Sequence, residues 1–310
     1  MQLYVGVTDH DWFQYLAAAA PDEVNFWRPG SSQGFRALNP GEPFLFKLKA
    51  PHNAIAGGGF FIRYTALPLT VAWSTFGVKN GTPDFETFAS KIHRYRSDDV
   101  PNPTIGCVIL TRPFFFAPED WVSVPANWHP NIVQGKTYDM QSGPGAQLWQ
   151  KVEDRLHARI AQSDRPSEAP VVAEELARYG ADYVAQNRLG QGSFRALVTD
   201  AYNRRCAFTG EKTLPALQAS HIKPYAQSGP HRVSNGLLLR ADLHQLFDRG
   251  YLTITNDHHI EVSRRIKAEF DNGDAYYALH GQRLQALPAQ PGDRPSPEFI
   301  AYHQNRVFAP

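Results

Sequence analysis

The chain has 310 residues, a formal net charge of +1, 42% hydrophobic residues and 12% aromatic residues. This length suits about two domains, and the apolar content is sufficient for packed cores. No apolar run approaches the roughly 20 residues of a membrane helix, and the N-terminal residues lack the basic and apolar regions of a signal peptide. We therefore expect a soluble, cytoplasmic protein that does not act at a membrane.

The cysteine content and the charge limit the chemistry further. Cys107 and Cys206 are too few for a disulfide framework or a four-cysteine zinc site, so a bound metal would depend on His, Asp and Asn side chains. A protein that binds DNA through massed positive charge alone is more basic than this chain. Recognition of nucleic acid should therefore rely on shaped pockets as well.

The N-terminal part alternates between short apolar runs and turns rich in Gly, Pro and Asn. Such runs predict strands at residues 3–7, 44–48, 59–64 and 105–110. Helical spacing of apolar residues predicts helices at residues 11–20, 85–95 and 146–160. The expected fold class is α+β, and residues 1–160 should form a curved β-sheet or barrel with peripheral helices.

Residues 161–190 are predicted to be a linker, because residues 161–170 are rich in Pro, Ser and charged side chains and lack an apolar period. Residues 191–310 should form a second domain. A helix is expected at its start with Ser193 as the N-cap, followed by a tight turn. Two short strands, a helix beginning at Asp242 and a closing pair of strands follow, which predicts a ββα unit.

Three residues of this unit suit the hydrolysis of a phosphodiester bond. The reaction needs a general base for water, a divalent cation to neutralise charge on the phosphate and leaving oxygen, and rigid support for both. A neutral imidazole such as His221 suits the base, because its pKa lies near the working pH. Asn235 can brace the loop between the strands, and His244 on the helix can bind the cation.

Taken singly, these residues are typical of ordinary cores, surfaces and turns. Their joint spacing is specific. The segments Ala-Ser-His-Ile-x-Pro, Ser-Asn-Gly-Leu-Leu-Leu and Asp-Leu-His-x-Leu-Phe-Asp-x-Gly closely resemble the HNH (ββα-metal) endonucleases of restriction enzymes, over about residues 194–260. The resemblance implies that His221 is the general base, Asn235 the middle asparagine and His244 the metal-binding histidine.

One departure from the family concerns the metal. Many relatives carry Asp or His directly before the base as a second ligand, and here the position is Ser220, a poor ligand. We expect His244, water and phosphate oxygens to hold the ion, with Ser220, Asp242 and Asp248 as further candidates; the two aspartates suit capping or packing equally well. Mg²⁺ is the default ion, and Mn²⁺, Co²⁺ or Ni²⁺ also suit a single-metal site. A structural zinc would need four Cys or His ligands, which the segment lacks.

The N-terminal part carries a second resemblance. Segments such as Tyr4-Val-Gly-Val-Thr-Asp9, Val24-Asn-Phe-Trp27 and Ile55-Ala-Gly-Gly-Gly-Phe60 resemble the EVE members of the PUA-like superfamily, over about residues 1–135. The resemblance implies a pocket that holds a flipped, modified base between aromatic faces. The candidate stacking residues are Phe26, Trp27, Trp73 and Phe76, and the candidates for reading an edge or a phosphate are Arg28, Ser31, Ser32 and Gln33. Most aromatic residues of this half must nevertheless be core.

Together, the two resemblances predict a modification-dependent restriction endonuclease. The first domain would read a methylated or hydroxymethylated cytosine in double-stranded DNA, and the HNH module would cut nearby. Cleavage of both strands is simplest from a homodimer. Two alternatives stay open: a non-selective HNH nuclease or nickase of the toxin or repair type, and a non-catalytic binder of modified nucleic acid.

Overall fold

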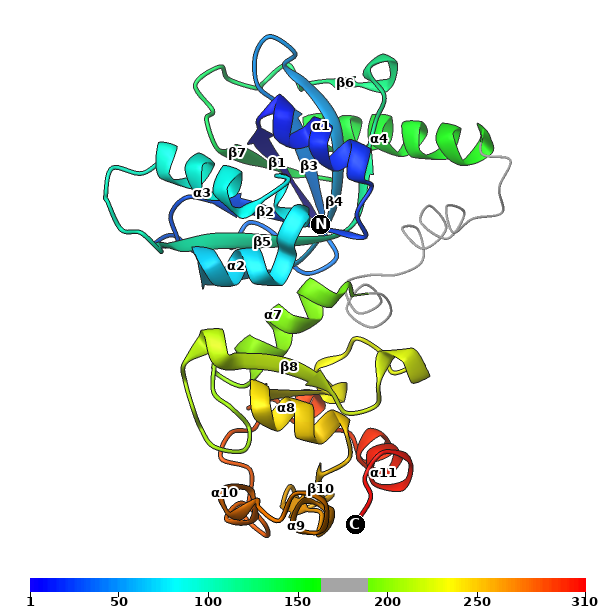
Figure 1. Cartoon of the computed structure of the whole chain (residues 1–310). Coiled ribbons are helices and arrows are strands. Elements are labelled where there is room, and N and C mark those ends of the chain that lie inside the picture. Colours follow the sequence, from blue (N-terminus) through cyan, green and yellow to red (C-terminus); the bar gives the residue numbers. More distant parts are fainter. Residues whose placement is uncertain (163–188) are drawn as a thin grey trace. The chain divides into compact units, whose positions relative to one another are not determined.

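The computed structural model describes residues 1–162 and 189–310, and the chain divides into two compact units, Met1–Gln186 and Asn187–Pro310 (Figure 1). The predicted linker, residues 161–190, lies almost wholly outside the described residues. Each unit has its own hydrophobic core. None of the helices within the described ranges is long and apolar enough to cross a membrane.

The N-terminal unit is built on a mixed β-sheet with the strand order β2-β5-β4-β3-β1-β7, and β6 pairs with β4. Its strands are β1 (Gln2–Thr8), β2 (Glu23–Arg28), β3 (Pro43–Leu48), β4 (Ala54–Pro68), β5 (Thr104–Phe115), β6 (Val122–Ser123) and β7 (Gly135–Asp139). Strands β1 and β3 are parallel, and the other neighbouring pairs are antiparallel. Within residues 1–162 the path ends at β2 and β7, so the sheet is open. The predicted α+β class is confirmed, with an open sheet in place of a closed barrel.

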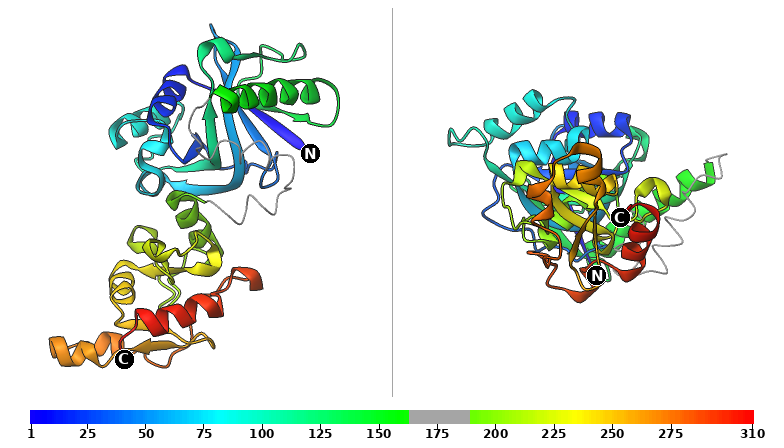
Figure 2. Two further views of the ribbon diagram at one scale, coloured as in Figure 1. Left: turned by 90° about the vertical axis from the view of Figure 1, so that its right-hand side faces the viewer. Right: turned by 60° about the horizontal axis from the view of Figure 1, so that its bottom comes forward.

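Helices cover both faces of this sheet. The unit's α-helices are α1 (His10–Ala19), α2 (Leu69–Phe76), α3 (Phe85–Arg94) and α4 (Gly143–Gln162). Because successive side chains of a strand point to opposite faces, Phe44 and Phe46 pack with α1 while Leu45 packs with α4. In β4, Phe61 packs on the face of α1 and Phe60 on the face of α4. The unit therefore has three layers, with the sheet between helices (Figure 2). Two register shifts in β4 mark bulges that increase the local bend.

The C-terminal unit contains the predicted ββα element. Its elements are α7 (Gln191–Ala201), β8 (Leu217–His221), β9 (Gly236–Arg240), α8 (Ala241–Asp248), β10 (Leu252–Ile254), β11 (Ile260–Val262), α9 (Arg265–Phe270), α10 (Asp274–Tyr277) and α11 (Pro297–Arg306). Strands β8 and β9 are antiparallel, with His221 opposite Gly236, and α8 begins directly after β9. The prediction for Ser193 was wrong: Gly190 takes the N-cap position of α7, and Ser193 is buried within the first turn.

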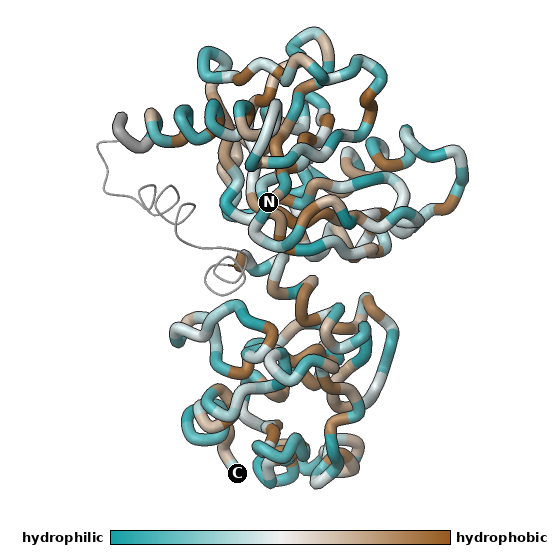
Figure 3. Tube along the Cα trace, turned by 180° about the vertical axis from the view of Figure 1, so that it is seen from behind, coloured by the Kyte–Doolittle hydropathy of each residue, from teal (hydrophilic) through white to brown (hydrophobic). Residues whose placement is uncertain are grey.

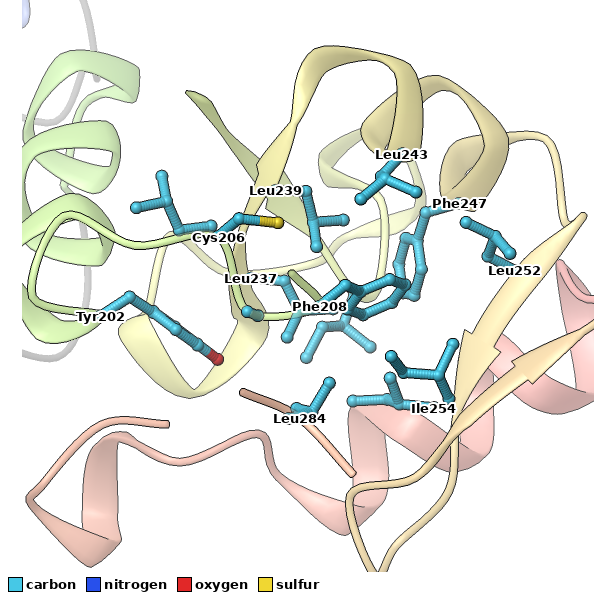
Figure 4. Packing of buried hydrophobic residues seen from close by; sticks show 14 of the residues in the cluster. Tyr202, Cys206, Phe208, Leu237, Leu239, Leu243, Phe247, Leu252, Ile254 and Leu284 are labelled. Carbon is cyan, nitrogen blue, oxygen red and sulfur yellow. The ribbon is translucent and has the colours of Figure 1, made fainter. Parts of the chain in front are cut away.

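The hydrophobic core of this unit holds the strands and the helix of the ββα element together. Leu237 and Leu239 of β9, Leu243 and Phe247 of α8 and Phe208 of the preceding turn pack together (Figure 4). Burial of one such side chain contributes about 1.5–3 kcal/mol, so the cluster stabilises the relative positions of β9 and α8. Figure 3 shows hydrophilic residues concentrated on the outer turns of the trace.

Cys206 and His303 make further contacts within this core. The sulfur of Cys206 is buried and accepts a hydrogen bond from the Arg240 N–H, so this cysteine is a packed thiol. His303 ties α11 to the core, with Nδ1 at 2.8 Å from Thr253 Oγ1 and Nε2 at 3.1 Å from the carbonyl oxygen of Phe247. Its ring also stacks on Phe247 at a centroid distance of 3.8 Å.

Candidate active site

The side chains of Ser220, His244 and Asp248 meet where β8 packs against α8. Gln218 and Ser220 are alternate residues of β8 and face the helix, while His244 and Asp248 lie one helical turn apart. His244 Nε2 lies 3.1 Å from Asp248 Oδ2, and Ser220 Oγ donates to Asp248 Oδ1 at 3.3 Å. His244 Nδ1 lies 2.7 Å from Gln218 Oε1.

This arrangement fits a divalent cation. His244 Nε2 and the Asp248 carboxylate lie close enough that a cation between them would be bound by both side chains. One imidazole, one carboxylate and one hydroxyl suit Mg²⁺ or Mn²⁺, which keep several water ligands. The side chain of Asp248 is 54% exposed, so water and phosphate oxygens can approach. Within residues 1–162 and 189–310 there is no group of three or more His, Cys, Asp or Glu side chains suited to a metal.

Asp242 does not join this group. Its two carboxylate oxygens accept hydrogen bonds from the Arg240 guanidinium at 2.8 and 2.6 Å. These hydrogen bonds lower the pKa of the Asp242 carboxyl. The structure thus separates the two aspartates that the sequence left as equal candidates: Asp248 faces His244, and Asp242 forms an ion pair at the start of α8.

His221 ends β8 and faces away from α8. Phe194 of α7 stacks on its ring with a centroid distance of 3.9 Å and an interplanar angle of 12°. Burial lowers the pKa of His221 to about 4, and the charge of a protonated His231 acts in the same direction. Asp248 and His244 also influence this pKa, so both lie near His221. The His221 imidazole is therefore neutral at physiological pH, as a general base must be.

Asn235 is fully buried and holds the loop between β8 and β9. Its Oδ1 accepts from the Lys223 N–H at 2.8 Å, and its Nδ2 donates to the carbonyl oxygens of Lys223 and Pro230, each at 3.0 Å. The Ile222 N–H donates to the Asn235 carbonyl oxygen at 2.9 Å. These four hydrogen bonds tie together the two ends of the loop that begins immediately after His221.

The same loop brings His231 next to His221. His231 Nδ1 lies 2.9 Å from His221 Nε2, and the Tyr225 ring stacks on His231 at a centroid distance of 4.4 Å. Both residues lie between the first two of the three HNH-like motifs, in a stretch that none of these motifs includes. Their positions depend on how the loop folds back, which spacing along the chain does not encode.

A cavity of about 710 Å³ opens in the N-terminal unit beside β1, β2 and β3. Aromatic rings form much of its lining: Phe26 lies 4.6 Å from Phe44, and Tyr4 lies 5.1 Å from Phe44, between ring centroids. Gly6 lies behind these rings, and a Cβ atom there would collide with Phe44. The absence of a side chain at Gly6 therefore allows the aromatic rings to pack over β1.

Charged groups line the same cavity. Lys49 Nζ lies 2.6 Å from Asp9 Oδ1 and donates to Tyr95 Oη at 3.2 Å, while Tyr95 Oη donates to Asp9 Oδ2 at 3.0 Å. Although burial opposes it, the hydrogen bonds to Asp9 and Tyr95 raise the pKa of Lys49. Lys47 Nζ donates to Asn53 Oδ1 at 2.8 Å, and burial lowers the pKa of Lys47.

The predicted pocket residues divide into two groups. Those that line the cavity are Phe26, Trp27 and Arg28. Those that lie outside its lining are Ser31, Ser32, Gln33, Trp73 and Phe76. Trp73 packs against Phe85 and Phe88, and Phe76 is buried in α2, so both aromatic side chains contribute to packing.

The lining residues that sequence reasoning missed include Tyr4, Asp9, Lys47 and Lys49. Tyr4 lies in β1 and Lys47 in β3, while Asp9 and Lys49 directly follow these two strands, which pair in parallel. A parallel pair of strands brings the carboxyl ends of both strands to one edge of the sheet. A prediction that β1 and β3 are parallel would therefore have indicated that these residues lie together.

The ββα element thus combines the half-buried His221 with a lowered pKa, a loop held by Asn235, and a histidine and a carboxylate that suit a divalent cation. The model of the family HNH_2, described as HNH endonuclease, matches residues 206–255, which include β8, β9 and α8. The C-terminal unit therefore contains an HNH endonuclease module, and the predicted HNH resemblance is confirmed.

No curated protein matches the sequence significantly. Among solved structures, ASCH from Zymomonas mobilis is similar to the chain with a TM-score of 0.32 and 9% identity, covering 49% of this chain and 94% of its own. A mutant of the same protein has a TM-score of 0.33 and 10% identity, covering 48% and 97%. A structure described as the modification-dependent TagI restriction endonuclease has a TM-score of 0.28 and 15% identity, covering 92% of this chain and 75% of its own.

Proposed function

We propose that the protein is a modification-dependent DNA endonuclease, which reads a methylated or hydroxymethylated cytosine with its N-terminal unit and hydrolyses phosphodiester bonds with its HNH module. One observation carries the proposal. The chain combines an HNH module whose His221 is neutral with a separate cavity of about 710 Å³, lined by aromatic rings and charged side chains. A cavity of this composition suits a flipped base, which needs stacking faces and groups that read its edge.

In the cutting step, His221 takes the proton from the attacking water, and Asn235 keeps the loop that follows it in place. His244 and Asp248, with a weaker contribution from Ser220, would hold a divalent cation, Mg²⁺ by default with Mn²⁺, Co²⁺ or Ni²⁺ as alternatives. When bound, such a cation supplies positive charge that neutralises the phosphate and the leaving oxygen. The protein's own contribution is a desolvated base on one side of the scissile phosphate and two ligands on the other.

In the reading step, the cavity offers contacts for each edge of a cytosine. The Asp9 carboxylate can accept from the N4 amino group, as acidic residues do in base recognition. The ammonium groups of Lys47 and Lys49 can donate to acceptor atoms of the base or to a phosphate. Phe26 and Trp27 supply aromatic surface, and stacking contributes about 1–3 kcal/mol per base, comparable with the cost of flipping. A methyl or hydroxymethyl substituent adds contact area in the same cavity.

Duplex cleavage needs two cuts, one in each strand. We propose that a homodimer supplies two HNH modules, since a symmetric pair presents one site to each strand. The partner is double-stranded DNA carrying modified bases, met in the cytoplasm.

The proposal is tested by digestion of four matched duplexes that carry cytosine, 5-methylcytosine, 5-hydroxymethylcytosine or 6-methyladenine at the same positions. Each is incubated with Mg²⁺, with Mn²⁺ and with a chelator. We expect cleavage only with metal, and preferentially of the DNAs with modified cytosine. The His221→Ala variant should still bind DNA while its cleavage falls by at least about 10²-fold.

The other outcomes separate the alternatives. Equal cleavage of all four DNAs would remove the modified-base reading and leave a non-selective nuclease. Selective binding by the parent without cleavage under any metal condition would instead identify a non-catalytic binder. Cleavage by His221→Ala at the parental rate would reject His221 as the base.

A further inference from the structure

The feature that the cutting step leaves unexplained is the histidine pair formed by His221 and His231. Their facing nitrogens, Nε2 of His221 and Nδ1 of His231, lie 2.9 Å apart. Phe194 stacks on the first ring at an interplanar angle of 12°, and Tyr225 stacks on the second at 14°. The two imidazoles are thus held between two aromatic rings, which limits the rotation of both.

The backbone that carries His231 is also held. The carbonyl oxygen of Pro230 accepts from Asn235 Nδ2 at 3.0 Å, and that of Arg232 accepts from the Asn235 N–H at 2.9 Å. Both neighbours of His231 are therefore bonded to the same buried asparagine. The asparagine that braces the base also positions the second histidine.

A hydrogen bond between two neutral imidazoles contains one proton. Whether His221 or His231 donates this proton decides whether His221 has a nitrogen that can accept a proton from water. If His231 donated from Nδ1, His221 would carry its own proton on Nδ1 and have no free lone pair for water. If His221 donates from Nε2, its Nδ1 is unprotonated and can take a proton. Only the second arrangement is compatible with His221 as a general base.

We propose that His231 is a positioning residue for the base: its Nδ1 accepts the Nε2 proton of His221 and so presents the unprotonated Nδ1 of His221 to the attacking water. This inference rests on the proposed nuclease function. A partner that holds the distal nitrogen of a catalytic imidazole sets both its tautomer and its orientation. His231 itself contacts neither the substrate nor the cation in this role.

The kinetic test compares His231→Leu with His231→Asn in the full-length protein. Leucine removes the acceptor, so we expect kcat to fall about 10²-fold with an unchanged KM. The Asn side-chain oxygen can occupy the place of Nδ1, so His231→Asn should recover most of the lost kcat. His157→Leu, which removes an exposed histidine of α4, is the matched control and should behave as the parent. Equal kcat for His231→Leu and the parent, or equal losses for Leu and Asn, would overturn the inference.

A second measurement does not depend on cleavage. Nitrogen-15 NMR of histidine-labelled protein, with the His221 signals assigned by their loss in His221→Gln, reports which ring nitrogen carries the proton. We expect protonation at Nε2 in the parent and a mixture of tautomers in His231→Leu. A parental proton on Nδ1 would refute the positioning role. Failure of the parent to cut any DNA would contradict the proposed function alone, because the tautomer is read separately.

Discussion

Asn235→Asp is the sharpest test of how the active-site loop is held. Asn235 is fully buried, and its Nδ2 donates to two carbonyl oxygens at 3.0 Å. The substitution preserves the size of the side chain but replaces both donors with an acceptor. Each buried acceptor left without a donor costs about 1–3 kcal/mol, so the C-terminal unit should lose about 2–6 kcal/mol at neutral pH. This corresponds to a fall in Tm of roughly 10 °C or more.

The loss should depend on pH with a definite sign. The introduced carboxyl can regain one donor by taking up a proton, so its folded-state pKa lies above the unfolded value of about 3.9. Stability that depends on this protonated form is present at low pH and is lost as the pH rises through the folded-state pKa. The Tm difference between variant and parent should therefore be smaller at about pH 5 than at about pH 8.

Thermal unfolding of the full-length protein at both pH values measures this difference, and cleavage assays below the Tm measure kcat. Asn256→Asp is the matched control, because Asn256 is exposed in the turn between β10 and β11. It should leave both Tm and kcat unchanged. A variant at Asn235 that unfolds with the parent at pH 8, or that differs from it equally at both pH values, would refute the role of these hydrogen bonds.

Three further predictions follow from the two sites and from the core. Asp248→Asn should lower Mn²⁺ affinity by at least about tenfold in calorimetric titration, while Asp242→Asn should not, and equal effects would contradict the ligand assignment. Phe26→Ala should weaken binding to DNA with modified cytosine by about 1–3 kcal/mol. Trp73→Ala should keep the selectivity for modified cytosine, since Trp73 lies outside the cavity. Unchanged selectivity in both variants would reject this cavity as the site that binds the base. Burial lowers the pKa of His303 to about 4. The contribution of the neutral His303 side chain to the free energy of unfolding is therefore complete above the unfolded-state pKa and is lost as the pH falls through the folded-state pKa. The parent should therefore lose about 3 kcal/mol more than His303→Gln between about pH 7 and pH 4, and parallel stability curves would exclude this effect.

The HNH module was predictable because its signal is local. The residues of β8, β9 and α8 are close in sequence, and short connections bring consecutive elements side by side. Leu237, Leu239, Leu243 and Phe247 show the strand and helix periods that make the inner faces of β9 and α8. The helix start at α7 was misjudged because a serine in a suitable position is only one of several residues that can precede a helix.

The details of both sites were harder to predict. Asp242 and Asp248 belong to one helix and have the same chemistry, but Asp242 meets Arg240 while Asp248 meets His244. The partner of each aspartate depends on which side chains lie next to its position on the helix. In the N-terminal unit, Trp73 has a side chain suited to stacking, yet its helix packs it against Phe88.

The sequence by itself determined the class of the C-terminal module and predicted a candidate base, brace and metal-binding histidine, because their spacing on a ββα element leaves few other arrangements. It also determined the α+β class, since strand and helix periods are properties of short segments. The tertiary structure alone decided that Asp248 joins His244, that His231 meets His221, and that the ends of β1 and β3 contribute Asp9 and Lys49 to one cavity. These pairings arise from loop closure and strand order, which bring together side chains whose separation along the chain carries no periodic signal.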